Sequence, residues 1–475
     1  MTRIGCFALA VGFWLSVTAA HAAPRKVILD TDGDADYDDV VALMVAAVSP
    51  EVQVLGVVAT GKDAERRGRS IAKALDVVGR DDIGVYLGAA PLSPEPAFAY
   101  MSQFPRRLYG LRPQLEQWAE DFAYAPQPTS GVDFYLQQMT AFPGEISVIV
   151  TGPLSTLGRA MQVADERGSG QSFRRAIQQV LFSGGDVGTV EYNVYCDLGA
   201  AKLLFTSGVP IYQFGGEGEG KAYLQHDDRQ RLWQAQTPAT WALQNLYRLY
   251  RAGWDPTSPF VPILYDVHPV AFLIAGPAIS GFEPAAIDVD ADGRLVRGTG
   301  PPNANVRVTN HGDRLVEFFI TRMTATTPMA VNHLRALERL AGADGGELRS
   351  LADGAIAQLS GATPPDRAAL VAPLDQMRRQ LPALGDRAAR AEWHLDMAQQ
   401  FLVGEPGHEV WQDPYTPTFI ALYLVPFKIL GLALAHKAIA AGVFLVGAVA
   451  VAWLVRGLWR SRRVRPERAT PVAAR

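Results

Sequence analysis

Apolar runs alternate with segments of helical spacing along residues 25–325. The run KVILDTD is typical of a strand, and the segment after it, DDVVALMVAAVS, places Val40, Leu43, Met44 and Ala47 on one face of a helix. Further strands are predicted at VQVLGVVAT, IGVYLGA, EISVIVTGP and QQVLFSGG, with helix-like segments RSIAKALDVVG and STLGRAMQV between them. Uncharged strands that alternate with helices predict the α/β class, with a doubly wound, mostly parallel sheet covered on both faces.

The ends of these predicted strands indicate where a ligand would bind. The stretches DTD, ATG, TGP and SGGD all follow apolar runs directly. In open parallel sheets, ligands bind outside the carboxyl ends of the strands. Residues 90–130, rich in proline and aromatic residues, form a long insertion near this edge. A lid over the site and a plain surface excursion are equally good interpretations of that insertion.

Two other patterns complete the predicted organisation. Residues 326–412 are rich in Ala, Leu and Arg at helical spacing, which predicts a helical stalk after the α/β domain. The stretch IDVDADGRLVRG resembles a calcium loop but has Thr299 in place of the final glutamate. It is better interpreted as a hairpin with a tight Asp-Gly turn.

The N-terminus has the pattern of a secretory signal peptide. Arg3 precedes an apolar run, and AHA, ending at Ala22, is a small-x-small cleavage site. We therefore expect a signal peptide over residues 1–22, and the alternative is an uncleaved anchor.

The C-terminal region predicts a membrane tether. Residues 438–455 are eighteen uncharged, mostly apolar residues, which is just enough for one transmembrane helix. The tail 456–475 is rich in arginine, so the positive-inside bias places it in the cytoplasm and the main domain outside, in the periplasm if the cell is bacterial. Residues 419–434 are apolar but contain Pro426 and Lys428, which predicts a membrane-interface helix, with a second span as the alternative.

Composition narrows the function classes. The formal net charge of the 475-residue chain is −4, which argues against binding nucleic acid through a basic surface. Only Cys6 and Cys196 occur, and Cys6 lies in the predicted signal peptide, so the mature chain has no pair for an internal disulfide. Cys196 is interpreted as a buried small apolar residue, with a reactive thiol as the less favoured alternative.

The first strand–helix junction carries an unusual density of negative charge. Six aspartates fall within ten positions, and no Lys or Arg lies between Lys26 and Lys62; the six are Asp30, Asp32, Asp34, Asp36, Asp38 and Asp39. Strand alternation predicts that Asp30 and Asp32 point the same way. A helix N-terminus stabilises a carboxylate by only about 0.3–1 kcal/mol, too little to offset the repulsion. A hard divalent cation such as Ca²⁺ is the natural counter-ion, and the alternative is a solvated acidic loop without metal.

Two known templates fit this junction poorly. An EF-hand loop fails because Ala35 stands at its glycine and Val41 at its last glutamate. The opening of haloacid-dehalogenase-like phosphatases resembles VILDTDGD, with Asp30 as nucleophile, Asp32 as acid/base and Mg²⁺ as cofactor. That template gives no reason for Asp38 and Asp39.

A third template fits over some 300 residues. DTDGDADYDDVVAL resembles the opening of the inosine/uridine-preferring nucleoside hydrolase family, with the turn glycine one place early at Gly33. Four later stretches resemble the family's motifs in the same order: VYLGA, VTGPLSTLG, FSGGDVGTVEYNVYCDLGAAKLL and LYDVHPVAFL. Each motif is weak alone, but their common order favours this family over the phosphatase.

The resemblance implies a set of roles for particular residues. Asp32, Asp39, the Thr151 carbonyl and Asp266 would bind one Ca²⁺, and Asp32 would also take a proton from a calcium-bound water. Asp38 would hold ribose hydroxyls, with Asp266 as a second candidate, and Glu191 and Asn193 would contact the far side of the sugar. Carboxylates suit such a reaction because cleavage of an N-glycosidic bond develops an oxocarbenium-like cation. The family also usually assembles as dimers or tetramers, which leaves a homo-oligomer as an expectation.

Two departures from the family concern the substrate side of the site. Lys62 stands where a sugar-binding asparagine is expected, and Tyr265 stands where many members have the histidine that helps the leaving group. Tyrosine can donate a proton, whereas a lysine cation opposes a developing positive charge unless it pairs with Asp34 or Asp36. The leading hypothesis is a membrane-tethered, Ca²⁺-dependent hydrolase of a nucleoside or related ribosyl compound. The alternative is a catalytically silent relative that binds a ribosyl ligand or a partner protein.

Overall fold

The computed structural model describes residues 23–33, 37–61, 63–93, 118–119, 121–215, 222–253, 261–342, 345–361 and 367–404. The predicted signal peptide, interface helix, transmembrane helix and basic tail lie outside these residues, as do Lys62 and most of the predicted lid. In the described part of the chain, every helix is too short or too polar to cross a membrane.

An eight-stranded sheet is the main organising element of the described chain. Its order is β3-β2-β1-β4-β5-β6-β10-β7, and every neighbouring pair is parallel except β10 and β7. The strands are β1 (Arg25–Thr31), β2 (Val52–Ala59), β3 (Val85–Leu87), β4 (Ile146–Val150), β5 (Ile177–Ser183), β6 (Ile211–Phe214), β7 (Ser280–Ala285) and β10 (Ala304–Asn310). The prediction of a mostly parallel α/β sheet is confirmed.

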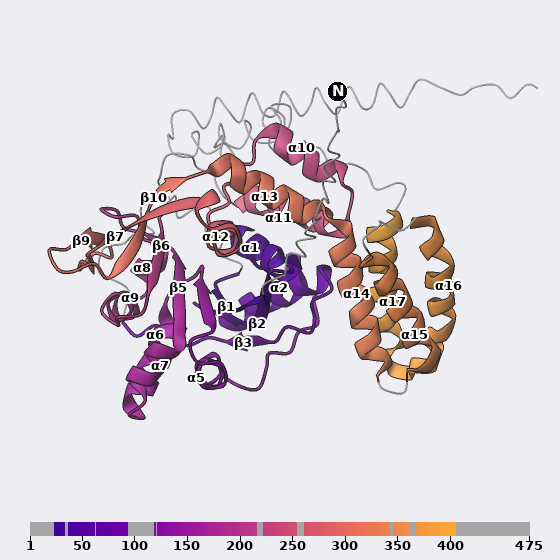
Figure 1. Cartoon of the computed structure of the whole chain (residues 1–475), viewed down its shortest axis with the longest axis horizontal. Helices are drawn as coiled ribbons and strands as arrows, with labels where there is room; N and C mark the ends of the chain where they lie inside the picture. Colours follow the sequence, from indigo (N-terminus) through magenta and orange to yellow (C-terminus); the bar gives the residue numbers. More distant parts are fainter. Residues whose placement is uncertain are drawn as a thin grey trace, which may run out of the picture.

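Helices cover both faces of this sheet, as Figure 1 shows. One face packs on α1 (Tyr37–Val48), α2 (Ala64–Val77), α11 (Pro238–Gly253), α12 (Val267–Ala275) and α13 (Gly312–Thr324). The other packs on α5 (Gly131–Ala141), α6 (Ser155–Glu166), α7 (Gly170–Ala176) and α9 (Leu198–Phe205). The alternation along β1 divides its side chains between two cores, with Leu29 in the first and Ile28 in the second.

Helix α1 is more deeply enclosed than its sequence predicts. The spacing of Val40, Leu43 and Met44 indicates one apolar face, yet all twelve residues of the helix are buried. The reason is that α2, α11, α12 and α13 surround it on the sides that do not face the sheet. Asp38 and Asp39, in its first turn, are therefore buried as well.

The predicted hairpin at residues 287–297 is confirmed. β8 (Ile287–Val289) and β9 (Leu295–Arg297) pair in antiparallel register. Asp290 Oδ1 accepts hydrogen bonds from the backbone N–H groups of Asp292 and Arg294, both at 2.9 Å, and Gly293 adopts a φ of +90°. The aspartate thus stabilises a turn. The remaining short helices of the α/β part are α8 (Tyr192–Cys196) and α10 (His226–Gln234).

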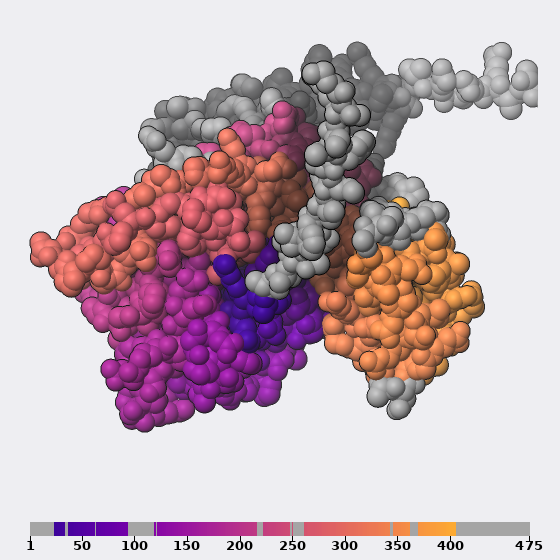
Figure 2. Space-filling model, viewed as in Figure 1, coloured from indigo at the N-terminus to yellow at the C-terminus, as the bar shows by residue number. Residues whose placement is uncertain are grey.

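A separate group of helices follows the α/β part. It consists of α14 (Thr326–Ala341), α15 (Gly346–Leu359), α16 (Val371–Gln380) and α17 (Ala388–Val403), with 3₁₀ turns at Arg367–Leu370 and Leu381–Arg387. These helices pack on one another at one end of the molecule (Figure 1), and the space-filling view shows them as an orange lobe (Figure 2). We call this group the helical unit.

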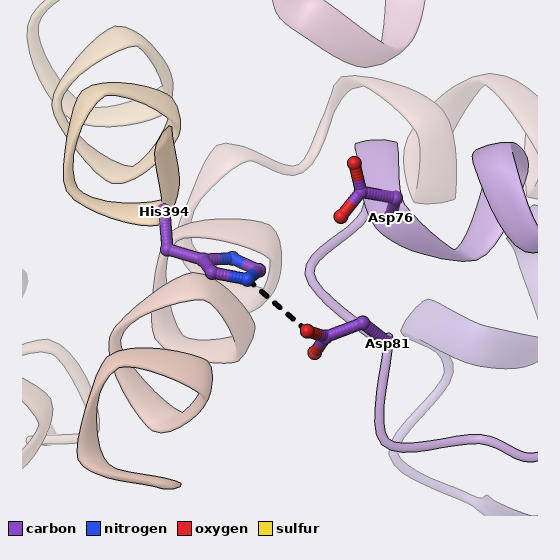
Figure 3. A group of neighbouring side chains, drawn as sticks. All are labelled: Asp76, Asp81 and His394. Carbon is purple, nitrogen blue, oxygen red and sulfur yellow. Dashed lines mark hydrogen bonds and ion pairs between the residues drawn. The ribbon is translucent and has the colours of Figure 1, made fainter. Parts of the chain in front are cut away.

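The helical unit meets the α/β part at the turn between α2 and β3. Asn332 Nδ2 donates to the Val78 carbonyl at 3.1 Å, and Gly79 lies so close that an added Cβ would be 2.6 Å from the His333 backbone nitrogen. Figure 3 shows His394 of α17 facing Asp81, with Asp76 nearby. Arg339 also pairs with Asp81, at 2.5 Å, so this contact is both tightly packed and charged.

The pH dependence of stability should carry a contribution from His333. Burial, and secondarily the charge of His394, lower the pKa of His333 to about 3, against about 6.5 in an unfolded chain. Because the folded pKa is depressed, the His333 contribution to the free energy of unfolding is fully present above pH 6.5. It is lost as the pH falls below 6.5, where the unfolded chain takes up a proton that the folded protein does not. Thermal unfolding between pH 7.5 and 5 should show this loss, and His333→Gln should reduce the slope. Part of the slope should persist, since burial also lowers the pKa of His268 to about 3; an unchanged slope would contradict the assignment.

Candidate active site

Three carboxylates converge at the carboxyl edge of the sheet. Asp38 and Asp39 come from the first turn of α1, and Asp266 immediately precedes α12. One oxygen of each lies within 4.8 Å of the others, and all three residues are buried. We call these residues the acidic triad. Their spacing is suited to a single cation with oxygen ligands.

Hydroxyl groups at the ends of three adjacent strands hold the triad in place. Asp39 Oδ1 accepts from the Thr31 hydroxyl at 2.7 Å and from the Thr151 hydroxyl at 2.8 Å. Asp266 Oδ1 accepts from the Ser183 hydroxyl at 2.6 Å. Thr31, Thr151 and Ser183 lie at or just after the ends of β1, β4 and β5, so the parallel sheet itself fixes the carboxylates.

The electrostatics of the triad favour the binding of a cation. Burial raises the pKa of Asp39 well above its usual value, and the negative charges of Asp32 and Asp38 raise it further. The pKa of Asp266 is raised by burial and then by Asp38 and Asp39. Both shifts express the cost of ionised carboxylates close together in a poorly solvated place. A divalent cation would remove that cost, so the donor set fits the metal that the family implies.

Asp32 lies beside the triad but has a partner of its own. Its Oδ2 is 2.7 Å from Arg67 Nη1, and the same nitrogen donates to the Asp32 backbone carbonyl. Both side chains are almost completely buried, with exposed fractions of 3% and 6%. The predicted metal ligand and base is therefore near the triad, while its carboxylate forms an ion pair with an arginine of α2.

Asp30 occupies a different environment from Asp32. Tyr135 of α5 donates to Asp30 Oδ2 at 2.9 Å, on the face of the sheet opposite to α1. Burial raises the pKa of Asp30 to about 8. The prediction that Asp30 and Asp32 point the same way is wrong, because β1 ends at Thr31 and its alternation does not extend to Asp32.

The residues predicted to contact the sugar are largely engaged with the backbone. Glu191 Oε2 accepts from the N–H groups of Gly185, Asn193 and Val194 at 2.9–3.2 Å, and burial raises the pKa of Glu191 to about 7. Asn193 Nδ2 donates to the carbonyls of Thr151 and Ser183 at 2.9 and 3.0 Å. Asn193 thus links the predicted Thr151 ligand to the end of β5.

Tyr265 lies next to the triad in sequence and is only partly buried. Lys62, the other predicted substrate-side residue, is not described, so its role stays a prediction.

Arg67 is the most consequential site residue that the sequence analysis missed. A signal for it was present, because helical spacing places Arg67 on the same face as Ile71 and Ala74, which are both buried. A cation on the buried face of a helix near an acidic loop indicates an ion pair. Ser183 was also missed, although the quoted stretch FSGGD contains it.

Comparison with known proteins agrees with this geometry. Residues 27–317 match the family model described as inosine-uridine preferring nucleoside hydrolase. The chain belongs to this family. The matched range contains most of β1, the whole acidic triad and the first part of α13, so family membership covers the α/β part of the chain.

Individual relatives of this nucleoside hydrolase family member are moderately similar. A pyrimidine-specific ribonucleoside hydrolase, RihA, from Photobacterium profundum is 28% identical over 263 residues, covering 53% of this chain and 80% of the relative. A probable uridine nucleosidase 2 from Arabidopsis thaliana is 28% identical over 261 residues, covering 53% and 73%. A solved plant nucleoside hydrolase, PpNRh1, has a TM-score of 0.55 at 22% identity, covering 64% of this chain and 99% of that one, and supports the fold alone.

Proposed function

We propose that this chain hydrolyses the N-glycosidic bond of a nucleoside or related ribosyl compound in a Ca²⁺-dependent reaction. Family membership supports the reaction class. The convergence of Asp38, Asp39 and Asp266, three buried carboxylates on one centre, carries the proposal of a cation. Ca²⁺ is chosen because it accepts oxygen ligands in flexible geometry, including carboxylates and backbone carbonyls.

The residues of the site have separate proposed tasks. Asp39 and Asp266, together with the Thr151 carbonyl and Asp32, are the proposed ligands, and Asp38 is placed to share the cation or to accept hydrogen bonds from ribose hydroxyls. Bound Ca²⁺ would neutralise the carboxylates and activate water for the attack. Asp32 is the proposed proton acceptor, and Tyr265 is the proposed proton donor to the leaving base.

A panel of nucleosides with and without EDTA tests the proposal. We expect release of free base in Ca²⁺, loss of that release in EDTA and recovery when Ca²⁺ is returned in excess. Asp32→Ala should abolish release while circular dichroism shows a folded protein. Asp288→Asn, an exposed change on β8, is the matched control and should retain activity. Turnover that is unaffected by EDTA would overturn the metal dependence.

A catalytically silent relative is the second candidate, and the Asp32–Arg67 ion pair is the observation that favours it. A proton acceptor that is held by a guanidinium is less available to water. Binding of Ca²⁺ or ribose measured by calorimetry, without turnover of any purine or pyrimidine nucleoside, would favour this candidate over the hydrolase.

We also propose a location at the cell membrane. The sequence patterns at 1–22 and 438–455 support a single-pass protein with an extracytoplasmic main domain, and the arginines of 456–475 support a cytoplasmic tail. Protease treatment of intact cells or spheroplasts tests this arrangement. Digestion of the α/β domain with protection of a C-terminal tag is the expected result, and protection of both would contradict it.

A further inference from the structure

A guanidinium reaches the candidate active site from α2. Arg67 follows the β2–α2 turn, and only 5% of the residue is exposed. Gly61 in that turn has a φ of +85°, and a Cβ added there would be 3.4 Å from Arg67 Cζ. The turn therefore packs directly on the guanidinium and fixes its position in the site.

Asp32 interacts with both Arg67 and the acidic triad. The Arg67–Asp32 ion pair measures 2.7 Å, while the carboxylates that share a centre are those of Asp38, Asp39 and Asp266. The charge of Asp32 still raises the pKa values of Asp39 and Asp266, so it lies within electrostatic reach of both. Asp32 is thus paired with Arg67 and close enough to the acidic triad for a cation held there to attract it.

We propose that Arg67 competes with the bound cation for the Asp32 carboxylate and so weakens cation binding. This inference rests on the proposed function, since it concerns the cation of that site. A guanidinium and a divalent ion repel each other, and at separations of a few ångströms the repulsion remains strong even with an effective dielectric constant near 20. The Asp32 carboxylate can therefore pair with Arg67 or bind the cation, and binding the cation requires the ion pair with Arg67 to break.

Calorimetric titration of the full-length protein with Ca²⁺ tests the competition. Arg67→Met keeps the length of the side chain and removes its charge, so the Ca²⁺ affinity should rise about tenfold or more. Arg67→Lys keeps the charge and should stay within about threefold of the wild-type affinity. A purely structural role for Arg67 would lower or preserve the affinity of Arg67→Met, and either result would overturn the proposal.

A double-mutant cycle with Asp32→Asn isolates the coupling between the two residues. In the presence of Arg67, Asp32→Asn should change Ca²⁺ affinity only a few fold. In the Arg67→Met background the same change should remove the whole gain. Equal effects of Asp32→Asn in both backgrounds would overturn the competition.

A thermal measurement covers the case in which Arg67→Met folds poorly. Without Arg67, the buried Asp32 carboxylate lacks its partner, so the variant should unfold earlier than wild type in EDTA and gain more from added Ca²⁺. An equal or smaller gain overturns the proposal. Wild-type protein that neither binds Ca²⁺ nor cleaves nucleosides would instead defeat the proposed function, so the two failures are distinguishable.

A second and independent inference concerns the junction drawn in Figure 3. The Val77 carbonyl lies 3.1 Å from His333 Nε2, His333 Nδ1 lies 3.0 Å from His394 Nδ1, and His394 Nε2 lies 3.1 Å from Asp81 Oδ2. Both rings are completely buried. The chain of contacts begins at a carbonyl and ends at a carboxylate, and neither of these groups can donate a proton.

Counting donors along this chain gives the protonation of each ring. The Val77 carbonyl requires a proton on His333 Nε2 and the Asp81 carboxylate requires one on His394 Nε2, so the contact between the two Nδ1 atoms needs a third proton on one of the rings. The Asp81 carboxylate contacts the His394 ring and stabilises the positive charge there, so Nδ1 of His333 is the acceptor. His394 must then donate from Nδ1 to His333 and from Nε2 to Asp81. We infer that His394 is held as a doubly protonated imidazolium that joins the helical unit to the α/β part.

The charges around His394 are consistent with this assignment. Asp76 faces it from the end of α2 and Asp81 from the α2–β3 turn. Arg339 and His333 face it from α14, and Arg390 from its own helix. Asp76, Asp81 and His394 are close enough together to hold a metal ion. Arg390 pairs with both aspartates, so a guanidinium already neutralises them.

Nitrogen-15 NMR of the histidine-labelled full-length protein at pH 7.5 tests the inference. His394 should show both ring nitrogens protonated, and His333 should show the neutral Nε2–H tautomer; assignment uses His394→Gln and His333→Gln. In Asp81→Asn the amide can donate to His394 Nε2, so the imidazolium signal should disappear. A neutral His394 in wild type, or an imidazolium that persists in folded Asp81→Asn, would overturn the assignment.

Discussion

Asp39→Asn is expected to abolish the Ca²⁺ response and to lower kcat/KM for any nucleoside that is turned over by at least about three orders of magnitude. The carboxylate lies at the centre of the acidic triad and accepts hydrogen bonds from Thr31 and Thr151. Asparagine keeps the shape and the accepting oxygen, so the hydroxyl contacts survive while the negative charge is lost. Base release and calcium titration measure the two effects.

The same substitution should stabilise the metal-free protein. Burial and neighbouring charges raise the pKa of Asp39 above its unfolded value, so its ionised form opposes folding at neutral pH. Thermal unfolding in EDTA should therefore shift upward in Asp39→Asn, whereas Asp288→Asn should show neither effect. Retained Ca²⁺ binding in Asp39→Asn would contradict the assignment of the triad.

Gly79→Ala is expected to weaken the attachment of the helical unit by at least about 3 kcal/mol. Gly79 has a φ of +73°, where a Cβ costs about 1 kcal/mol, and the added atom would be 2.6 Å from the His333 backbone nitrogen. Backbone cannot move aside as a side chain can, so overpacking adds about 2 kcal/mol or more. The free energy of unfolding in urea measures the total, and limited proteolysis shows whether the helical unit separates.

Gly168→Ala is the matched control for this prediction. Gly168 has the same φ of +73°, and nothing lies within 4 Å of a Cβ placed on it. It should show the backbone cost alone, about 1 kcal/mol. Equal destabilisation by the two substitutions would mean that the contact with α14 contributes nothing.

The sheet could be predicted from the sequence because its strands are uncharged and separated by helices. Parallel strands buried on both faces give continuous apolar runs, and VILDT, VQVLGVVA and ISVIV all lie in strands. The antiparallel β10–β7 edge was not predicted, because β7 contains charged and exposed positions and lacks a comparable run. The docking of the helical unit was not predictable either, since it depends on contacts between residues about 250 positions apart, such as Asn332 and Val78.

The acidic part of the site could be predicted because aspartates are unusually dense at the first strand–helix junction. Asp39 and Asp266 could be assigned to one cation because the resemblance to the nucleoside hydrolase family implies it, and the structure brings them to one centre with Asp38. The partner of Asp32 was not predicted, because Lys62 is the first cation after the aspartates in sequence and Arg67 lies five residues further along the chain. Helix α2 carries that arginine back to Asp32.

The complete enclosure of α1 bears on how the catalytic apparatus responds to local opening. Amide hydrogens exchange with solvent only where a segment opens, and a helix surrounded by a sheet and four other helices can open only when much of the fold does. Deuterium uptake at Val40–Ala46 should accordingly be among the slowest in the protein. The aspartates at the start of this helix are therefore anchored to a part of the fold that opens rarely.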